Sequence, residues 1–243
     1  ATPYVSLEAD ADVAFLFKSY KLSGVQSGSN ANYTSSTSLF PAPGLHLLYF
    51  PTAALGGEFN LRHGFIPFRR TVGVGPQAHV ETFQGSVDQA TLQAELRKVF
   101  GGSGALAGGS ASVGLGLNYM GFKIQSQNPL VLTNDTYLGP IVSVGLRAPV
   151  KDPLTLRAGF GVLPLANLSQ SPVDNGKGSV FGLRGTLGLD YHINDRLFMA
   201  FDYGLDQLSA KFPSAGGSRN LQNAKSSDLY HGLTLTFGWR DYR

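Results

Sequence analysis

The most constraining feature of this sequence is the alternation of side chains from Asp228 to Arg240, which reads DLYHGLTLTFGWR. The odd positions are apolar apart from His231, whereas the even positions carry Tyr, Gly, Thr and Arg. A period of two is typical of a β-strand and not of a helix. At about 3.3 Å per residue the strand is about 40 Å long, and tilted by about 40° it spans the roughly 25 Å apolar band of a membrane.

The same alternation recurs along the chain and predicts one all-β domain over residues 1–243. Strands are expected at about 4–17, 44–50, 58–65, 78–85, 110–125, 136–149, 154–162, 181–191, 197–206 and 228–240. Short connections near 51–56, 150–152 and 193–195 alternate with longer ones near 23–43, 67–77, 126–135, 165–177 and 209–227. This pattern indicates a transmembrane antiparallel up-and-down β-barrel of about ten strands, although eight or twelve would also fit.

Residues 88–100, DQATLQAELRKVF, depart from the alternation. Leu92, Leu96 and Val99 fall at helical spacing, Asp88 is a suitable N-cap, and Gly101 can end a helix. We therefore expect a short amphipathic helix here. A strand interpretation is also open, because Leu92, Ala94 and Leu96 alternate too.

Composition bears on which face of the strands points outward. Only 14% of residues are charged and 31 are Gly, whereas an average protein has about 25% charged residues. The polar face is rich in Gly, Ser and Thr with isolated charges of both signs, and the outside of a soluble barrel would carry many Lys and Glu. We expect the apolar face to contact lipid and the polar face to line the lumen. A soluble β-sandwich with a core of aromatic side chains is the alternative.

A ten-stranded barrel is narrow, so its interior charges must pair where water is scarce. We therefore expect a largely plugged lumen. The predicted lumen charge network is Glu8, Asp10, Asp12, Lys18, Glu58, Arg62, Glu81, Arg147, Arg157, Arg184, Asp190, Asp202 and Asp206. Aromatic residues near strand ends are expected at the membrane interfaces: Tyr4, Phe17, Tyr20, Phe65, Tyr119, Tyr191, Tyr203, Trp239 and Tyr242.

Several function classes find no support in the sequence. The net charge is +3, but the 19 Lys and Arg are dispersed, so no nucleic-acid partner is expected. The common nucleotide, hydrolase, zinc-protease and calcium motifs are missing, and no cofactor is expected. His79 and Glu81 share a strand face, but two ligands are too few for a metal site.

The tract GLRGTLGLDYHINDRLFMAFDYGLDQL, together with the terminal LTLTFGW, resembles the small bacterial outer-membrane β-barrels of the OmpA, OmpX and OmpW type. The resemblance is one of pattern and selects no single family. It implies a bacterial outer-membrane location with periplasmic termini, and contact with outer-membrane lipid, lipopolysaccharide and other envelope proteins. Such barrels include anchors, adhesins, narrow channels and a few enzymes.

Three functions are compatible with the sequence. The first is a non-enzymatic barrel that serves as a structural anchor or docking component of an envelope assembly, and the second is a narrow channel for ions or small solutes. The third is an outer-membrane lipid hydrolase of the lipid A deacylase kind. It would use Ser19 and His231, which share the outward face of the two strands that close the barrel. No outward acid is found beside them, so no catalytic residue is expected in the leading hypothesis.

Overall fold

The computed structural model describes residues 4–72, 79–102, 106–125, 134–171, 174–213, 217–218 and 220–243, and the side chains of 67–72, 79–83 and 125 lie outside this description. Eleven strands form one antiparallel sheet. They are β1 (Val5–Gln26), β2 (Ser29–Ser36), β3 (Phe40–Tyr49), β4 (Leu55–Val72), β5 (His79–Val99), β6 (Ser110–Gln125), β7 (Asn134–Lys151), β8 (Leu154–Ser171), β9 (Ser179–His192), β10 (Leu197–Phe212) and β11 (Gln222–Tyr242).

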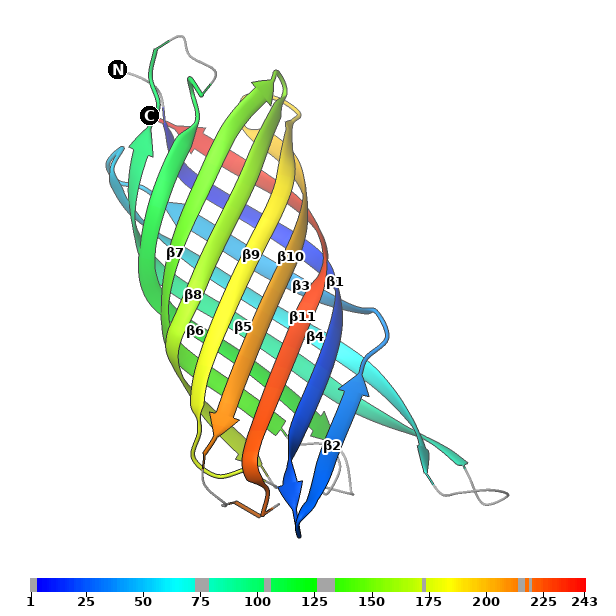
Figure 1. Cartoon of the computed structure of the whole chain (residues 1–243). Helices are drawn as coiled ribbons and strands as arrows, with labels where there is room; N and C mark the ends of the chain where they lie inside the picture. Colours follow the sequence, from blue (N-terminus) through cyan, green and yellow to red (C-terminus); the bar gives the residue numbers. More distant parts are fainter. Residues whose placement is uncertain are drawn as a thin grey trace.

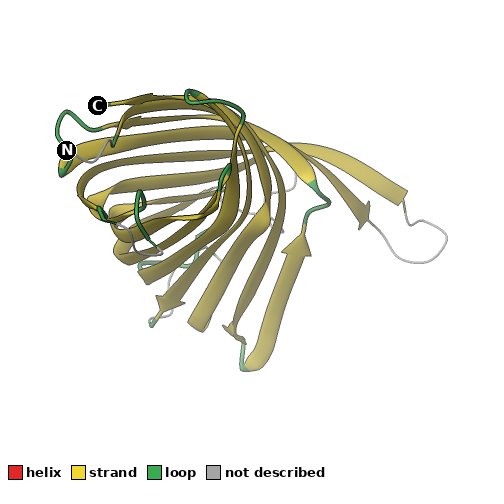
Figure 2. Cartoon of the chain, turned by 90° about the horizontal axis from the view of Figure 1, so that it is seen from above, coloured by secondary structure: helices red, strands yellow, loops and turns green. Residues whose placement is uncertain are grey.

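The sheet closes on itself because β1 also pairs with β11. Their ladder runs from Val5↔Tyr242 to Val25↔Gln222. The ten strands of the closed wall are β1 and β3 to β11, and β2 is an additional strand that pairs with β1 alone. Figure 1 shows the tilted strands of this barrel, and Figure 2 shows the closed ring from above. The predicted count of ten strands is therefore correct for the wall.

The two ends of the barrel differ. Tyr4 and Arg243 exchange backbone hydrogen bonds of 2.9 and 3.0 Å at what we call the terminal end, where the turns after β3, β7 and β9 also lie (Figure 1). The β1–β2 hairpin lies at the opposite end, which we call the loop end (Figure 1).

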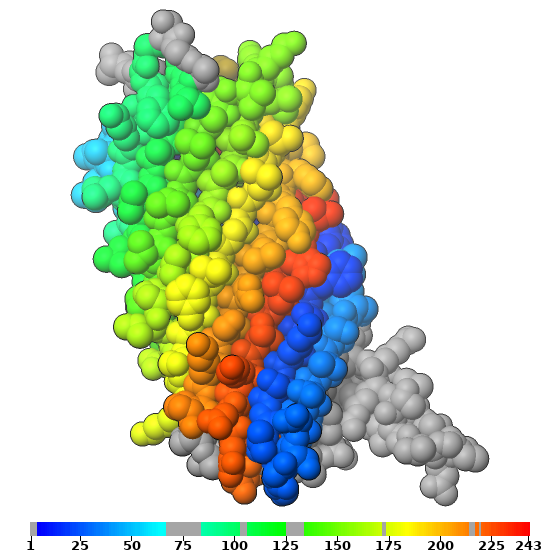
Figure 3. Space-filling view, in the orientation of Figure 1, coloured from blue at the N-terminus to red at the C-terminus, as the bar shows by residue number. Residues whose placement is uncertain are grey.

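The alternation predicted from the sequence separates the two faces of the wall. Apolar side chains such as Leu115 and Leu92, which are 64% and 62% exposed, point away from the barrel. Even-numbered residues of β1, such as Glu8 and Leu16, are buried inside it. On the face in Figure 3, β7 to β11 and then β1 lie side by side without a break. The molecule thus presents a continuous aliphatic and aromatic outer surface.

The predicted helix at 88–100 is wrong. Residues up to Val99 belong to β5, a strand of 21 residues that pairs with β4 and β6 along most of its length. Leu92 and Leu96 point outward and Gln93 and Glu95 point inward, so the alternation decides the structure and the helical spacing is incidental. In the described residues, no helix is long and apolar enough to cross a membrane.

The expected loop over 23–43 is also mostly strand. β1 continues to Gln26, and β2 then returns along it with the register Gln26↔Ser29 to Ser19↔Ser36. β3 takes over as the neighbour of β1 at Leu16↔Phe40. The polar composition belongs mainly to β2, whose residues are exposed or only partly buried, although Ala31 and Tyr33 pack against the apolar core inside the barrel.

The strand assignment of β5 can be tested by cross-linking, because the chain contains no Cys. Phe59 and Leu92 are cross-strand partners, and Cβ atoms of such partners lie about 5 Å apart. We expect Phe59→Cys/Leu92→Cys to form a disulfide on mild oxidation, seen as a mobility shift on a non-reducing gel. Phe59→Cys/Leu96→Cys is the control, since Leu96 lies about 13 Å farther along the strand. Equal cross-linking of both pairs would contradict the strand, because a helix places 92 and 96 on one face.

Candidate functional site in the barrel lumen

The lumen is divided into two layers with different chemistry. Inward side chains of the terminal half are charged and amide-bearing, and those of the loop half are mainly apolar. The division is visible along β1, where the inward residues are first Glu8, Asp10 and Asp12 and then Ala14 and Leu16. Both layers must be considered to decide whether solutes can pass.

Glu8 is the centre of the terminal layer and has no solvent exposure. Its carboxylate accepts hydrogen bonds of 2.7 and 2.9 Å from Arg147 and one of 2.5 Å from Arg240. Arg240 also pairs with Asp190, and Arg157 lies 2.7 Å from the same Asp190 carboxylate. This chain of alternating charges crosses the lumen from β1 to β7, β8, β9 and β11.

A second group of charges lies beside it. The His46 Nδ1 atom is 2.7 Å from Asp10, and its Nε2 atom is 3.2 Å from Glu58, which accepts a hydrogen bond of 2.5 Å from Gln93. Arg62 donates to Asp12 at 2.9 Å. The carboxylates therefore have cationic or amide partners, as buried charges require.

The loop layer is a core of packed apolar side chains inside the barrel. Its fully buried members include Phe40, Ile66, Met120, Leu163 and Phe212, which come from strands all around the wall. An interior of this kind excludes water and ions. The loop half of the lumen is closed by packing and not by charge.

One ion pair is enclosed within this apolar layer. Lys18 pairs with Asp228, and Tyr137 donates a hydrogen bond of 2.8 Å to the same carboxylate. The Lys18 ammonium group also lies over the rings of Phe122 and Tyr230, at 4.1 and 5.3 Å from their centroids. Cation–π contacts and the ion pair together satisfy a charge that has lost its water.

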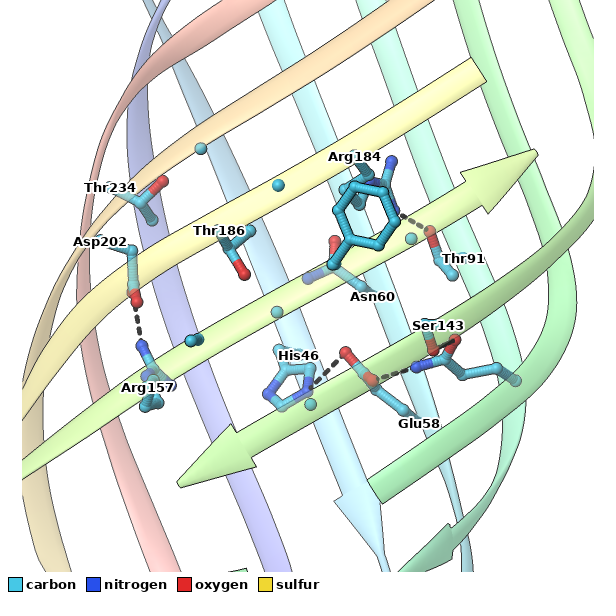
Figure 4. Close-up of a pocket in the computed structure, with 18 of the residues that line it drawn as sticks. His46, Glu58, Asn60, Thr91, Ser143, Arg157, Arg184, Thr186, Asp202 and Thr234 are labelled. Carbon is cyan, nitrogen blue, oxygen red and sulfur yellow. Dashed lines mark hydrogen bonds and ion pairs between the residues drawn. The ribbon is translucent and has the colours of Figure 1, made fainter. Parts of the chain in front are cut away.

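A polar cavity of about 320 Å³ lies within the terminal layer and reaches the edge of the apolar layer, because its lining runs from Arg97 and Ser110 near the terminal end to Leu16 and Ile141. Figure 4 shows side chains that line it, with Arg157 and Asp202 paired at one side and Arg184 and Thr91 at another. On the loop side the lining includes the apolar Leu16 and Ile141. The cavity is therefore amphipathic, with hydrogen-bonding groups on most of its wall and apolar groups both at its loop end and, at Leu48 and Phe50, toward the terminal end.

The structure brings together nearly all of the charged residues that the alternation of side chains along the strands predicted for the lumen. Each member whose side chain is described has a partner of opposite charge or, for Asp10 and Glu58, the imidazole of His46. The Glu81 side chain, and with it the expected His79–Glu81 pair, lies outside the description. Sequence reasoning missed Arg240, His46 and Asp228. All three are even-numbered on strands whose even positions face inward, so the same parity argument could have found them.

The aromatic residues expected at the interfaces occupy different environments. Phe17, Phe65, Tyr191, Tyr203 and Tyr242 are exposed on the outer surface, while Tyr4, Tyr119 and Trp239 are partly exposed. Tyr20 differs from the expectation, because it is buried in the loop layer. Its even number on β1 places it on the inward face with Lys18 and Leu22.

The outward pair Ser19 and His231 is not joined by a hydrogen bond among the described residues. Ser19 lies opposite Leu229, and the His231 ring stacks on Phe17 at 5.5 Å and contacts the Tyr203 hydroxyl at 3.3 Å. A different outward His has an acid partner. His63 on β4 lies 2.5 Å from Asp88 on β5, beside the ring of Phe65.

Three potential metal ligands, Glu8, Asp10 and His46, have ligand atoms within 4.8 Å of one another. Two arginines already neutralise Glu8, and their charge opposes a bound cation. We therefore assign this group to the ionic network.

Comparisons with known proteins identify the fold. No family model and no curated protein sequence matches the chain. The chain is similar in structure to the outer membrane protease OmpT from Escherichia coli, with a TM-score of 0.57 and 7% identity over 97% of this chain and 96% of that one. The outer membrane protein OprG from Pseudomonas aeruginosa gives 0.40, with 16% identity over 98% and 97%. An outer membrane channel from Pseudomonas putida F1 gives 0.41, with 12% identity over 96% of both chains.

The ionic layer predicts a large loss of stability when its centre is removed. Glu8→Ala leaves Arg147 and Arg240 without their shared anion in a buried site, and we expect a loss of about 3–5 kcal/mol in the free energy of unfolding. The measurement is denaturant unfolding in lipid vesicles, followed by the fluorescence of the single Trp239 and checked by gel mobility.

The control is Lys21→Ala, at an exposed position of the same strand, where we expect little change. Equal stability of the two variants would show that the Glu8 network contributes nothing to the fold.

Proposed function

We propose that this chain is an integral outer-membrane β-barrel with a largely plugged lumen, serving as a structural anchor or docking component of an envelope assembly. The observation that carries the proposal is the closure of the lumen. The network around Glu8 crosses the terminal half, and the apolar core around Phe40 and Met120 fills the loop half. The terminal half still holds the polar cavity among its paired charges, so the packed apolar core of the loop half is what blocks a water-filled path along the axis, which an open porin needs.

Location in the outer membrane is part of this proposal. Its support is the closed ladder, the continuous apolar outer surface and the fold shared with OmpT, which is named as an outer membrane protease. The membrane-facing belt on β1 runs from Leu7 to Phe17, about 33 Å along the strand. With the usual tilt it covers the roughly 25 Å of hydrocarbon that such barrels span. We place the terminal end in the periplasm because the shorter turns lie there.

Planar-bilayer recording tests the plugged lumen. We expect the purified, refolded protein to insert without steady conductance steps, since the packed apolar layer lies across the lumen. Steady ion-selective steps would contradict this proposal and favour the narrow channel. That second function is supported by the polar cavity within the terminal layer.

Docking can be tested in cells with a photo-crosslinking amino acid. At Asn32, an exposed position of β2, we expect a discrete cross-linked protein band if the loop end contacts an envelope partner. Leu115, on the outer surface of β6, serves as the matched position facing lipid, where lipid adducts are expected. Only lipid or lipopolysaccharide adducts at both positions would count against a protein partner at the loop end.

A further inference from the structure

The wall of the barrel has a seam between β3 and β4. Their ladder runs from Tyr49↔Gly57 to Gly44↔Arg62 and ends there. Beyond this point β3 continues to Phe40 paired only with β1, and β4 continues to Val72 paired only with β5. In Figure 2 the outer part of the β4–β5 hairpin leans away from the ring.

Two prolines explain where the ladder ends. The Phe50 backbone N–H donates to the Ser6 carbonyl of β1, so the even residues of β3 face β1 and the odd residues face β4. Pro41 and Pro43 therefore turn their nitrogen atoms toward β4. Proline has no N–H to donate, and the ladder cannot be continued through them.

Side chains close the seam where backbone hydrogen bonds do not. A Cβ atom on Gly64 would lie 2.9 Å from the Ala42 Cβ and 3.0 Å from the Phe40 ring, so only glycine permits this close approach. Phe40 and Ile66 are fully buried on the inner side. Rotation of one ring and separation of two strands that share no ladder beyond Gly44 would open the wall here, whereas the ladders of β7–β8 and β8–β9 resume beyond their register shifts.

The seam leads to the polar cavity. Arg62, the last β4 residue in the ladder, lines the cavity, and so does Leu16, the cross-strand partner of Phe40. On the outside, the seam lies next to the His63–Asp88 pair and to Phe65, which is 68% exposed. Polar and aromatic side chains together are typical of the boundary between hydrocarbon and headgroups.

We propose that the seam is a lateral portal through which small uncharged amphiphiles pass from the membrane into the cavity. The aliphatic part would contact Leu16 and Ile141, and a hydroxyl or carbonyl group would bond to the polar wall around Thr91. The arginines of the cavity, such as Arg62 and Arg184, are already paired with Asp12 and Asp206, so an anionic headgroup is not required. The proposal does not depend on the anchoring role, because it concerns entry from the side.

The backbone of the seam supports this ligand class. Odd residues of β4 face β3, so the N–H and C=O groups of His63 and Phe65 lie at the seam beyond the end of the ladder. In hydrocarbon such groups without a hydrogen-bond partner are costly. A molecule with a polar head and an apolar tail can form hydrogen bonds with these backbone groups as it passes the seam, whereas a pure hydrocarbon cannot.

The test uses one reporter cysteine, Ile141→Cys, in a chain that has no other. The protein is reconstituted in lipid vesicles and treated with either decyl methanethiosulfonate, which partitions into the bilayer, or a cationic trimethylammonium-ethyl methanethiosulfonate, which stays in water. We expect labelling by the decyl reagent only, and slower labelling when 1-octanol is added. The mass of the modified protein gives the extent of reaction.

Variants of the seam decide whether the route is lateral. Pro41→Val/Pro43→Val restores two N–H donors to the edge facing β4, and at about 1 kcal/mol per hydrogen bond it should slow decyl labelling roughly tenfold or more. Phe40→Ala should accelerate it. Pro149→Val is the control and should leave the rate unchanged, because Pro149 lies near the C-terminal end of β7, away from the seam.

Three outcomes would overturn the proposal. They are labelling by the cationic reagent as fast as by the decyl reagent, an unchanged rate in the double proline variant, and no labelling even with Phe40→Ala. Folding of every variant is checked by gel mobility, so a misfolded variant is recognised before its rate is interpreted. Conductance along the axis would overturn the anchor proposal and leave this test unaffected.

Discussion

The structure depends on the need of every backbone N–H and C=O group for a partner in an apolar environment. A single closed ladder meets this need, because each wall strand pairs with neighbours on both sides and β1 pairs with β11. With the backbone satisfied, the side chains are free to separate into an apolar outer face and a filled interior. The ladder between β3 and β4 ends at Gly44↔Arg62 and does not resume, whereas the ladders of β7–β8 and β8–β9 resume beyond their register shifts. The stretch from Gly44 to Phe40 of β3 is therefore where we propose entry from the side.

The interior is closed in two physically different ways. In the terminal half, arginine and carboxylate groups neutralise one another across the lumen, and each depends on its partner for stability. In the loop half, close packing of aliphatic and aromatic side chains excludes water. The polar cavity lies within the ionic layer and ends against the apolar one, which gives it a hydrogen-bonding wall and an aliphatic end.

Much of this arrangement could be predicted from the sequence, because a strand period of two assigns each residue to a face. The outward Leu and Phe residues and inward partners such as Glu8, Arg147 and Asp190 follow from parity alone. The helix expected at 88–100 was wrong because Leu92, Leu96 and Val99 satisfy both periods, and only pairing with β4 and β6 chooses between them. The apolar loop layer and the seam were not predicted, since both depend on which strands become neighbours and on where their registers end.

Closure of the wall brings the two ends of the sequence together, and this has a consequence for how the protein forms. Glu8 meets Arg240 across 232 positions of chain, so one of the contacts with the highest entropic cost of loop closure is also at the centre of the ionic layer. Until β11 is in place, Glu8 lacks one of its two arginines, Lys18 lacks its carboxylate partner, and the sheet has a bare strand edge. Folding of this barrel is therefore expected to be a late, nearly all-or-none event, and the unfinished intermediate is the species that needs protection from aggregation.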